Sequence, residues 1–310
     1  MKSFVIALFA ATAFGQWNVG PVLFQPGPSG TFDETAVKDP SIVYAEGKWR
    51  LFYTARGRNE YTLGYAAAPT LKGLAKTQRF QLRQLRGVKQ NYAAAPQVFF
   101  FRPQKKWYLI YQTTDANYQP VFSTTATIDD PNSWTPPKTL TEHTEAAKWI
   151  DFWVICDASN AYLFFTRSQK EVVAMQTSLA EFPSGWKDPR VVYAPVHEAT
   201  HVYRVGKRYE MLVELIDGPL RKYALTTAPA PAGPWTLASE EFASGRQLRD
   251  APGAVHWTDE VSHGELLRRG NDERMEVDAK SVSFLIQGMR KEQHQGEYPS
   301  LPWSLGIISK

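Results

Sequence analysis

A pair of strands joined by a turn recurs five times along the chain, and this repeat limits the folds that the chain can adopt. Each copy has a short polar or acidic cue near its start, continues as an apolar strand, and turns into a second strand rich in aromatic residues. The copies begin at Val37, Ala94, Trp149, His197 and Val261. Strand repeats of this kind are typical of β-propellers, whose blades recur about every 40–50 residues. The sequence therefore predicts an all-β protein, a five-bladed β-propeller.

Further strands lie between the copies, as a blade of three or four strands requires. Three of these segments share one order of features: a strand, small residues, a turn, and then Trp134, Trp186 or Trp235. The tail from Gln295 to Ile308 is aromatic and apolar. We expect it to pack against the first blade and close the ring, because closure removes open sheet edges.

Three of the five copies carry a carboxylate at the head of the first strand: Asp39, Asp151 and Glu198. In a propeller these positions converge on the central axis. Hydrolysis of a glycosidic bond needs one carboxylic acid and one carboxylate, and a third acidic group nearby favours the protonated form of the acid. Glu214 competes with Glu198 for the acid role, and we favour Glu198 because Glu214 follows an apolar second strand.

Composition and charge exclude several classes of protein. Of 310 residues 43% are hydrophobic, which suffices for a large core. The net charge of +4 comes with no long Lys/Arg run, so we expect no nucleic-acid partner. Cys156 is the single cysteine, which excludes an internal disulfide, and we interpret it as a buried apolar residue.

The first fifteen residues resemble a secretory signal. Lys2 is followed by an apolar stretch from Phe4 to Ala13 and by small residues before Gln16. We expect a secreted protein, extracellular or periplasmic, with a signal peptide at 1–15. Residues 16–310 are expected to form a single catalytic domain that is monomeric and does not span a membrane.

Six motifs, in order, resemble those of glycoside hydrolase family 62. They are VKDPSIV, AAPQVFFF with KKWYLIYQ, WIDFWVICD, HEATHVYRV, VSHGELLR and YPSLPWSLG. That family consists of secreted α-L-arabinofuranosidases on a five-bladed propeller, related to family 43. The resemblance covers nearly the whole chain after the signal, from Val37 to Ile308.

The resemblance implies a role for each matching residue. Asp39 would be the general base, Asp151 the carboxylate that orients and modulates the acid, and Glu198 the general acid. Lys38 would contact the arabinose, Tyr298 would line the cleft, and His263 would contact a metal ion, usually calcium, or ordered water in the central channel. Two further residues are candidate substrate contacts: His197, which could touch the substrate or tune Glu198, and Trp149, which could stack on sugar or belong to the blade core.

The chain departs from the family pattern at three places. Pro299 stands where family members have Asn, His197 where they usually have Phe, and residues 56–90 match poorly. Because a proline lacks both a backbone N–H and an amide side chain, a polymer contact at Pro299 is in doubt. Loops such as those in residues 56–90 shape the cleft outside the arabinose pocket, so the sequence leaves the substrate preference open.

The expected function is an inverting, exo-acting arabinofuranosidase that acts on arabinoxylan or arabinan in the plant cell wall. Inversion implies that the carboxyl groups of Asp39 and Glu198 lie roughly 6.5–9.5 Å apart, with a water between them. Two alternatives remain: a family 43-like β-xylosidase or arabinanase, and a carbohydrate-binding propeller without activity.

Overall fold

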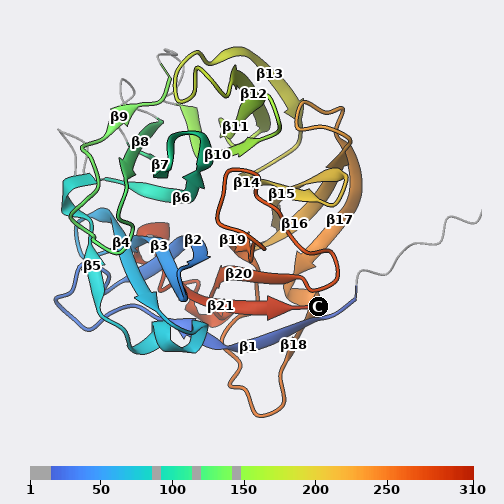
Figure 1. Cartoon of the computed structure of the whole chain (residues 1–310). Helices are drawn as coiled ribbons and strands as arrows, with labels where there is room; N and C mark the ends of the chain where they lie inside the picture. Colours follow the sequence, from blue (N-terminus) through green and yellow to red (C-terminus); the bar gives the residue numbers. More distant parts are fainter. Residues whose placement is uncertain (1–14, 86–91, 114–119, 142–147) are drawn as a thin grey trace, which may run out of the picture.

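Five blades stand around a central axis in the computed structural model, which describes residues 15–85, 92–113, 120–141 and 148–310 (Figure 1). Their strands pair in antiparallel fashion, except for a parallel pair at the outer edge of the fifth blade. The predicted five-bladed β-propeller is confirmed. The expected signal peptide lies outside the described residues, apart from Gly15. Among the described residues no helix is long and apolar enough to cross a membrane.

Four blades are built alike, each from four strands in chain order running from the axis outward. Their strands are, blade by blade, β2 (Ala36–Ala45), β3 (Lys48–Arg56), β4 (Tyr61–Ala68) and β5 (Arg79–Gln81); β6 (Ala94–Phe101), β7 (Lys106–Gln112), β8 (Val121–Thr125) and β9 (Lys138–Thr139); β10 (Trp149–Cys156), β11 (Asn160–Arg167), β12 (Glu171–Ser178) and β13 (Lys187–Tyr193); β14 (Glu198–Val205), β15 (Arg208–Asp217), β16 (Leu220–Ala228) and β17 (Thr236–Ser244).

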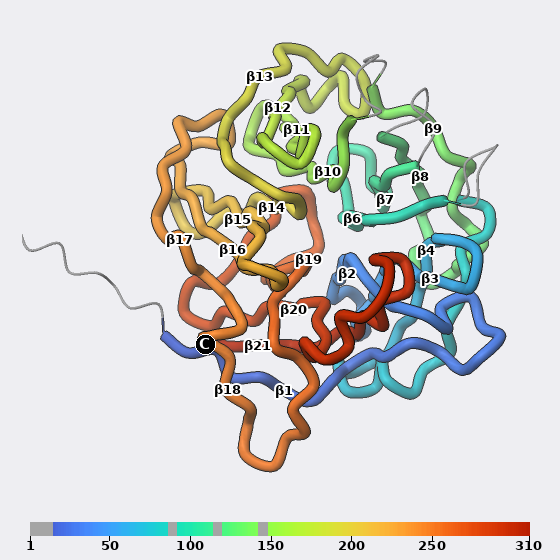
Figure 2. The backbone as a smooth tube through the Cα atoms, turned by 180° about the vertical axis from the view of Figure 1, so that it is seen from behind, coloured from blue at the N-terminus to red at the C-terminus, as the bar shows by residue number. Residues whose placement is uncertain are grey.

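The fifth blade joins the two ends of the chain. Its order from the axis outward is β19 (Ser262–Leu266), β20 (Ser283–Gly288), β21 (Ser304–Ser309), β1 (Trp17–Phe24) and β18 (Leu248–Asp250). In Figure 2 the blue β1 lies beside the red β21, and the two pair in antiparallel fashion. The tail packs against the first blade as expected, since the Val37 N–H donates to the Trp303 carbonyl at 3.1 Å and Leu305 lies in one core cluster with Val37. Its end forms β21 of the fifth blade, and pairing with the N-terminal strand β1 closes the ring.

Short 3₁₀ helices connect some of the strands. They are η1 (Leu71–Lys76), η2 (Arg83–Leu85), η3 (Arg102–Gln104), η5 (Gly245–Gln247), η6 (Lys291–Gln293) and η7 (Tyr298–Ser300). The hairpin between β2 and β3 turns on Glu46 and Gly47, both with positive φ. A two-residue turn of this kind matches the twist of the flanking strands.

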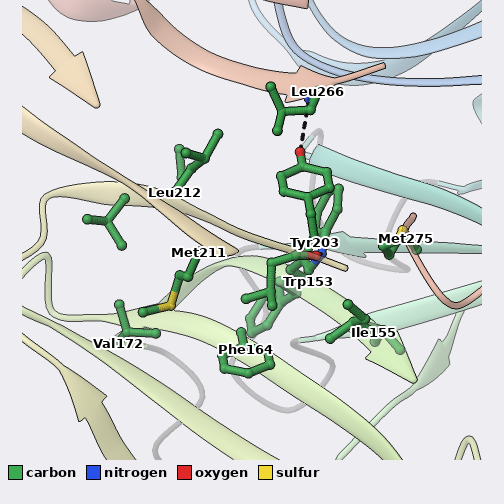
Figure 3. Packing of buried hydrophobic residues seen from close by; sticks show 14 of the residues in the cluster. Trp153, Ile155, Phe164, Val172, Tyr203, Met211, Leu212, Leu266 and Met275 are labelled. Carbon is green, nitrogen blue, oxygen red and sulfur yellow. Dashed lines mark hydrogen bonds between the residues drawn. The ribbon is translucent and has the colours of Figure 1, made fainter. Parts of the chain in front are cut away.

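Apolar side chains fill the spaces between neighbouring blades. Figure 3 shows Trp153 and Tyr203, from the inner strands of the third and fourth blades, in one cluster with Phe164 and Met211. The Tyr203 hydroxyl reaches the inner strand of the fifth blade and accepts a hydrogen bond of 3.0 Å from the backbone N–H of Leu266. Aromatic residues therefore join three successive blades through packing and through a satisfied polar tip.

The segment between β19 and β20, residues 267–282, crosses the end of the propeller where the inner strands finish. Its carbonyls accept hydrogen bonds from the backbone N–H groups of Phe100, Cys156 and Arg204. The buried Arg268 donates to two further inner-strand carbonyls, those of Ile42 and Val98. This insertion explains why the fifth sequence repeat is looser than the others.

Ring closure by β1 predicts that Trp17 supports the whole fold. Its ring is fully buried, and its Nε1–H donates to the Phe242 carbonyl at 2.9 Å. Trp17→Ala is expected to lower the free energy of unfolding by about 3–5 kcal/mol. Denaturant unfolding measures this, with the exposed neighbour Asn18→Ser as control, expected within about 0.5 kcal/mol of wild type. Equal stability of the two variants would contradict closure by this strand.

Candidate active site

A β-bulge at the start of every inner strand shapes one end of the central axis. The register against the second strand shifts once in each blade, immediately after Lys38, Ala94, Ile150, Glu198 and Ser262. The next residue has a positive φ in four blades: Asp39 (45°), Ala95 (50°), Asp151 (58°) and Ala199 (52°). Positive φ is uncommon for residues other than glycine, and bulges are frequent beside active sites.

The register also corrects the alignment of the three carboxylates. Asp39 and Asp151 are equivalent and share their place with His263 in the fifth blade. Glu198 lies one residue earlier and corresponds to Lys38. The expectation that all three acids stand at one repeat position is therefore correct for two of them. Nothing in the sequence shows where a β-bulge inserts its extra residue. Aligning the repeats by their strand starts therefore does not reveal that Glu198 lies one residue earlier.

Five hydrogen bonds join neighbouring blades at the bulges. Each bulge residue donates its backbone N–H to a side-chain oxygen of the preceding blade, over 2.6–2.9 Å. The pairs are Asp39 with Gln287, Ala95 with Thr54, Asp151 with Gln112, Ala199 with Asp151, and His263 with Glu214. We call these five contacts the bulge-amide ring. They fix the backbone from which Asp39, Asp151, His263 and Glu198 project.

The bulge-amide ring explains Glu214. In the register it faces Glu198, as Thr54 faces Lys38 and Gln112 faces Ala94. It is fully buried, and its Oε2 accepts hydrogen bonds from the His263 backbone N–H and the Ser262 hydroxyl. This carboxylate therefore occupies the place of a blade-joining acceptor, which supports Glu198 as the acid.

His263 lies between the two equivalent aspartates. Its Nδ1 is 3.3 Å from an oxygen of Asp39 and 4.0 Å from an oxygen of Asp151. Although burial favours the neutral ring, Asp39 and Asp151 hold the pKa of His263 above its ordinary value. A protonated imidazole at this point balances two buried carboxylates.

Asp39 is surrounded by cations. The Lys38 Nζ is 3.9 Å from its Oδ1, and both side chains are largely buried. Burial acts to raise the pKa of Asp39, but the charges of Lys38 and His263 outweigh it, so the pKa lies below its ordinary value. Asp39 is therefore ionised throughout the mildly acidic and neutral range.

Asp151 has the opposite tendency. Burial raises the pKa of this carboxyl, and the negative charges of Glu198 and Asp39 act in the same direction against the charge of His263. Its Oδ2 accepts the Ala199 N–H at 2.7 Å. The Asp151 carboxyl group thus holds the backbone immediately after Glu198, and its negative charge lies close to that of the Glu198 side chain.

Arg221 is a site residue that the sequence analysis missed. It lies on β16, and its Nη1 donates to Glu198 Oε1 at 2.8 Å and to Glu214 Oε1 at 2.7 Å. The register pairs Glu214 with Tyr223, two residues from Arg221. A diagonal neighbour on the same face of a hairpin can neutralise a buried acid. Glu214 within the apolar strand β15 is the sequence signal for this contact, because a buried acid calls for a cation on a neighbouring strand.

Three of the predicted substrate contacts, Lys38, Tyr298 and His197, lie around the carboxylates. The Lys38 Nζ is 4.4 Å from the ring centre of Tyr298, which is 38% exposed. The half-buried His197 has its Nε2 3.8 Å from Glu198 Oε2, and burial lowers its pKa. Tyr61, which the sequence analysis did not single out, also lies near Lys38, with its ring centre 5.7 Å from Nζ.

Trp149 belongs to the core rather than to the open cleft. It is 2% exposed and stacks on Phe165 with ring centres 4.0 Å apart. Because one face of the indole is covered in this way, little of the ring is left for a sugar. Of the two interpretations drawn from the sequence, the structure supports packing.

The surroundings of His263 do not fit a calcium cage. Calcium takes six to eight oxygen ligands, whereas His263 offers nitrogen, and its Nδ1 faces two carboxylates. Within the described part of the chain, one trio of potential ligands lies close together: His197, Glu198 and Glu214. Arg221 already bridges the two glutamates of that trio. Calcium at His263 stays an untested prediction, and no chemical step below involves a metal.

Comparison with known proteins identifies relatives over nearly the whole chain. Residues 16–309 match the family model of glycosyl hydrolase family 62. Alpha-L-arabinofuranosidase C of Cellvibrio japonicus (strain Ueda107) is 33% identical over 94% of this chain. The chain spans 46% of the length of that relative.

Solved structures agree with this result. The catalytic domain of a Coprinopsis cinerea family 62 α-L-arabinofuranosidase has a TM-score of 0.87 and 32% identity, over 95% of this chain and 96% of that one. A Podospora anserina α-L-arabinofuranosidase, in complex with cellotriose, has a TM-score of 0.85 and 31% identity over the same shares. A family 43 hydrolase at 14% identity and a TM-score of 0.61, over 92% of this chain and 91% of its own, shares the fold. The chain belongs to glycosyl hydrolase family 62.

Proposed function

We propose that this protein is a secreted, exo-acting α-L-arabinofuranosidase that removes arabinose side chains from arabinoxylan by an inverting mechanism. The observation that carries the proposal is the meeting of Asp39, Asp151 and Glu198 at the bulged ends of three inner strands. Relatives named as arabinofuranosidases support the activity. A family 62 hydrolase, 28% identical over 97% of this chain and 99% of its own with a TM-score of 0.85, was solved with xylotriose, which supports a xylan main chain as the polymer.

Asp39 acts as the general base in this proposal. A base must be ionised before it can take a proton from the attacking water. Lys38 and His263 favour the ionised carboxylate, as the lowered pKa of Asp39 indicates. Lys38 is also held beneath the ring of Tyr298, where its ammonium group can donate hydrogen bonds to the arabinose hydroxyls.

Glu198 acts as the general acid and protonates the oxygen that leaves with the main chain. Its side chain is 14% exposed, so it can reach a substrate at the mouth of the axis. Asp151 accepts the backbone N–H that directly follows Glu198 at 2.7 Å, and Arg221 holds Glu198 Oε1 at 2.8 Å. Asp151 thus contributes through position and charge rather than through proton transfer.

Substitution of Asp39, Glu198 and Glu214 separates the roles of these three acids. Asp39→Asn and Glu198→Gln are each expected to reduce arabinose release from arabinoxylan by about 10²–10⁴-fold, since each removes a proton-transfer group. Glu214→Gln is the matched control, because its amide oxygen can still accept the His263 N–H, and it is expected to retain turnover with a lower Tm. Sugar release and thermal unfolding are measured for all three.

Other outcomes of that experiment would redirect the assignment. An active Glu198→Gln beside an inactive, folded Glu214→Gln would move the acid role to Glu214. Release of xylose or of arabino-oligosaccharides by the wild type would indicate a specificity of the family 43 type. Binding of the polysaccharide without any release would leave a carbohydrate-binding propeller.

The charge of His263 is expected to set the acidic limb of the pH profile. His263→Gln removes a cation 3.3 Å from Asp39, so the pKa of Asp39 rises and the base is protonated at a higher pH. The acidic limb of kcat/KM is expected to move upward by about one pH unit. Rates from pH 3 to 8 measure the shift. His256→Gln, in a surface pair with Asp250 and Asp259, should leave the limb in place, and an unmoved limb in both variants would contradict the role of His263.

Secretion is proposed from the signal-like residues 1–15, and it can be tested separately from the activity. The positively charged and apolar segment ahead of Gln16 has the form of a secretory signal. Expression of the full chain in a secreting host is expected to give an exported protein whose N-terminus is Gln16. Retention inside the cell with an intact N-terminus would contradict export.

A further inference from the structure

A polar cavity of about 350 Å³ lies beside the candidate active site. It opens at the end of the propeller that carries the acids, since Arg56 pairs with Ala36 at the start of the first inner strand. In Figure 2 the red segment that precedes β21 crosses in front of β2, and this segment supplies one wall. The cavity walls include Ser29, Glu34, Arg56, Arg58, Pro299 and Ser300.

Two aromatic rings separate this cavity from Lys38. The Arg56 guanidinium carbon lies 4.7 Å from the ring centre of Tyr61, and Lys38 Nζ lies 5.7 Å from the same centre. Pro299 directly follows Tyr298, whose ring covers Lys38. A group attached to the same polysaccharide as the arabinose in the site can therefore reach the cavity.

The charges around the cavity do not cancel. Arg56 donates through Nε to the Pro299 carbonyl and through Nη1 to the Glu60 carbonyl, both at 3.1 Å. These acceptors carry no net charge, and among the described residues Nη2 has no hydrogen-bond partner. Arg58 is 77% exposed and lies 3.6 Å from Glu34. The wall thus has two guanidinium groups against one carboxylate.

Glu34 is held away from a ligand by its own loop. Its Oε2 accepts hydrogen bonds from the Gly30 N–H at 2.6 Å and the Ser29 hydroxyl at 3.3 Å. These bonds lower its pKa together with Arg58, against the effect of burial. The carboxylate is therefore turned toward local donors, and the remaining positive charge belongs to Arg56 and the outer part of Arg58.

We propose that this cavity is a subsite for a uronic acid residue carried by the polysaccharide next to the arabinose that is removed. The planar fork of a guanidinium group binds a carboxylate with two hydrogen bonds. The hydroxyl oxygens of Ser29 and Ser300 can accept hydrogen bonds from the sugar. The inference rests on the proposed function and adds a preference for acidic substrates to it.

Two matched substrates test the subsite directly. One is an arabinoxylo-oligosaccharide with a glucuronic acid branch beside the arabinosylated xylose, and the other is the same compound with its carboxyl group reduced to an alcohol. The ratio of kcat/KM, acidic over reduced, is expected to be about threefold to tenfold in low salt. It should fall toward one at about 0.5 M salt, because the interaction lies near solvent.

Substitutions of opposite charge should move this ratio in opposite directions. Arg58→Gln is expected to lower it and Glu34→Gln to raise it, each by about twofold to fivefold. Arg56→Lys keeps the positive charge and should retain part of the preference. Lys207→Gln, in the exposed turn at the other end of the propeller, is the charge control and should leave the ratio as in wild type.

The outcomes distinguish failure of the subsite from failure of the proposed function. A ratio near one in wild type, with arabinose released from both compounds, would overturn the subsite alone. The same change of ratio in Arg58→Gln and Glu34→Gln would also overturn it, since electrostatics requires opposite signs. No arabinose from either compound would overturn the proposed function itself.

Discussion

The bulge-amide ring is the constraint on which the site depends. Five inner strands break register at the same level, and each exposes a backbone N–H that can no longer bond within its own blade. A side chain of the preceding blade accepts every one of these donors. An unpaired buried N–H would cost about 1–3 kcal/mol, so the five contacts determine how neighbouring blades sit against one another.

One contact of the bulge-amide ring also belongs to the proposed catalytic site. At four of the five junctions the acceptor stands on a second strand, as Thr54, Gln112, Glu214 or Gln287. At the junction between the third and fourth blades the acceptor is Asp151, on the inner strand itself. The carboxylate that modulates the acid is thus also the group that holds the acid's backbone, so its position cannot vary independently of Glu198.

Charge balance is the second requirement of the site. Asp39, Asp151 and Glu214 are almost completely buried, and burial of an unpaired carboxylate is costly. Lys38, His263 and Arg221 compensate them from three different blades. The cations act unequally on the two equivalent aspartates, because the pKa of Asp39 is lowered and that of Asp151 is raised, and this difference leaves Asp39 as the ionised base.

Much of the fold could be predicted from the sequence, because strand repeats and turn residues report local structure. The five blades and the inner-strand position of the acids followed from that signal. The closing strand β1 could not be predicted, since pairing between residues 17–24 and the tail leaves no local pattern. The place of Glu198 one residue before the bulge and the contact of Arg221 with two glutamates depend on register across strands. Burial of Trp149 against Phe165 is likewise a property of packing that an aromatic residue alone does not reveal.

The stereochemistry of the first-formed sugar tests the central claim most directly. Asp39 and Glu198 are assigned as a base and an acid that work on opposite sides of the anomeric carbon, with water between base and sugar. Proton NMR during the first minutes of arabinoxylan hydrolysis should therefore show free arabinose first as the β-anomer, with the α-anomer growing in by mutarotation. Arabinose that appears first as the α-anomer would require a covalent intermediate and would contradict the roles given to these two residues.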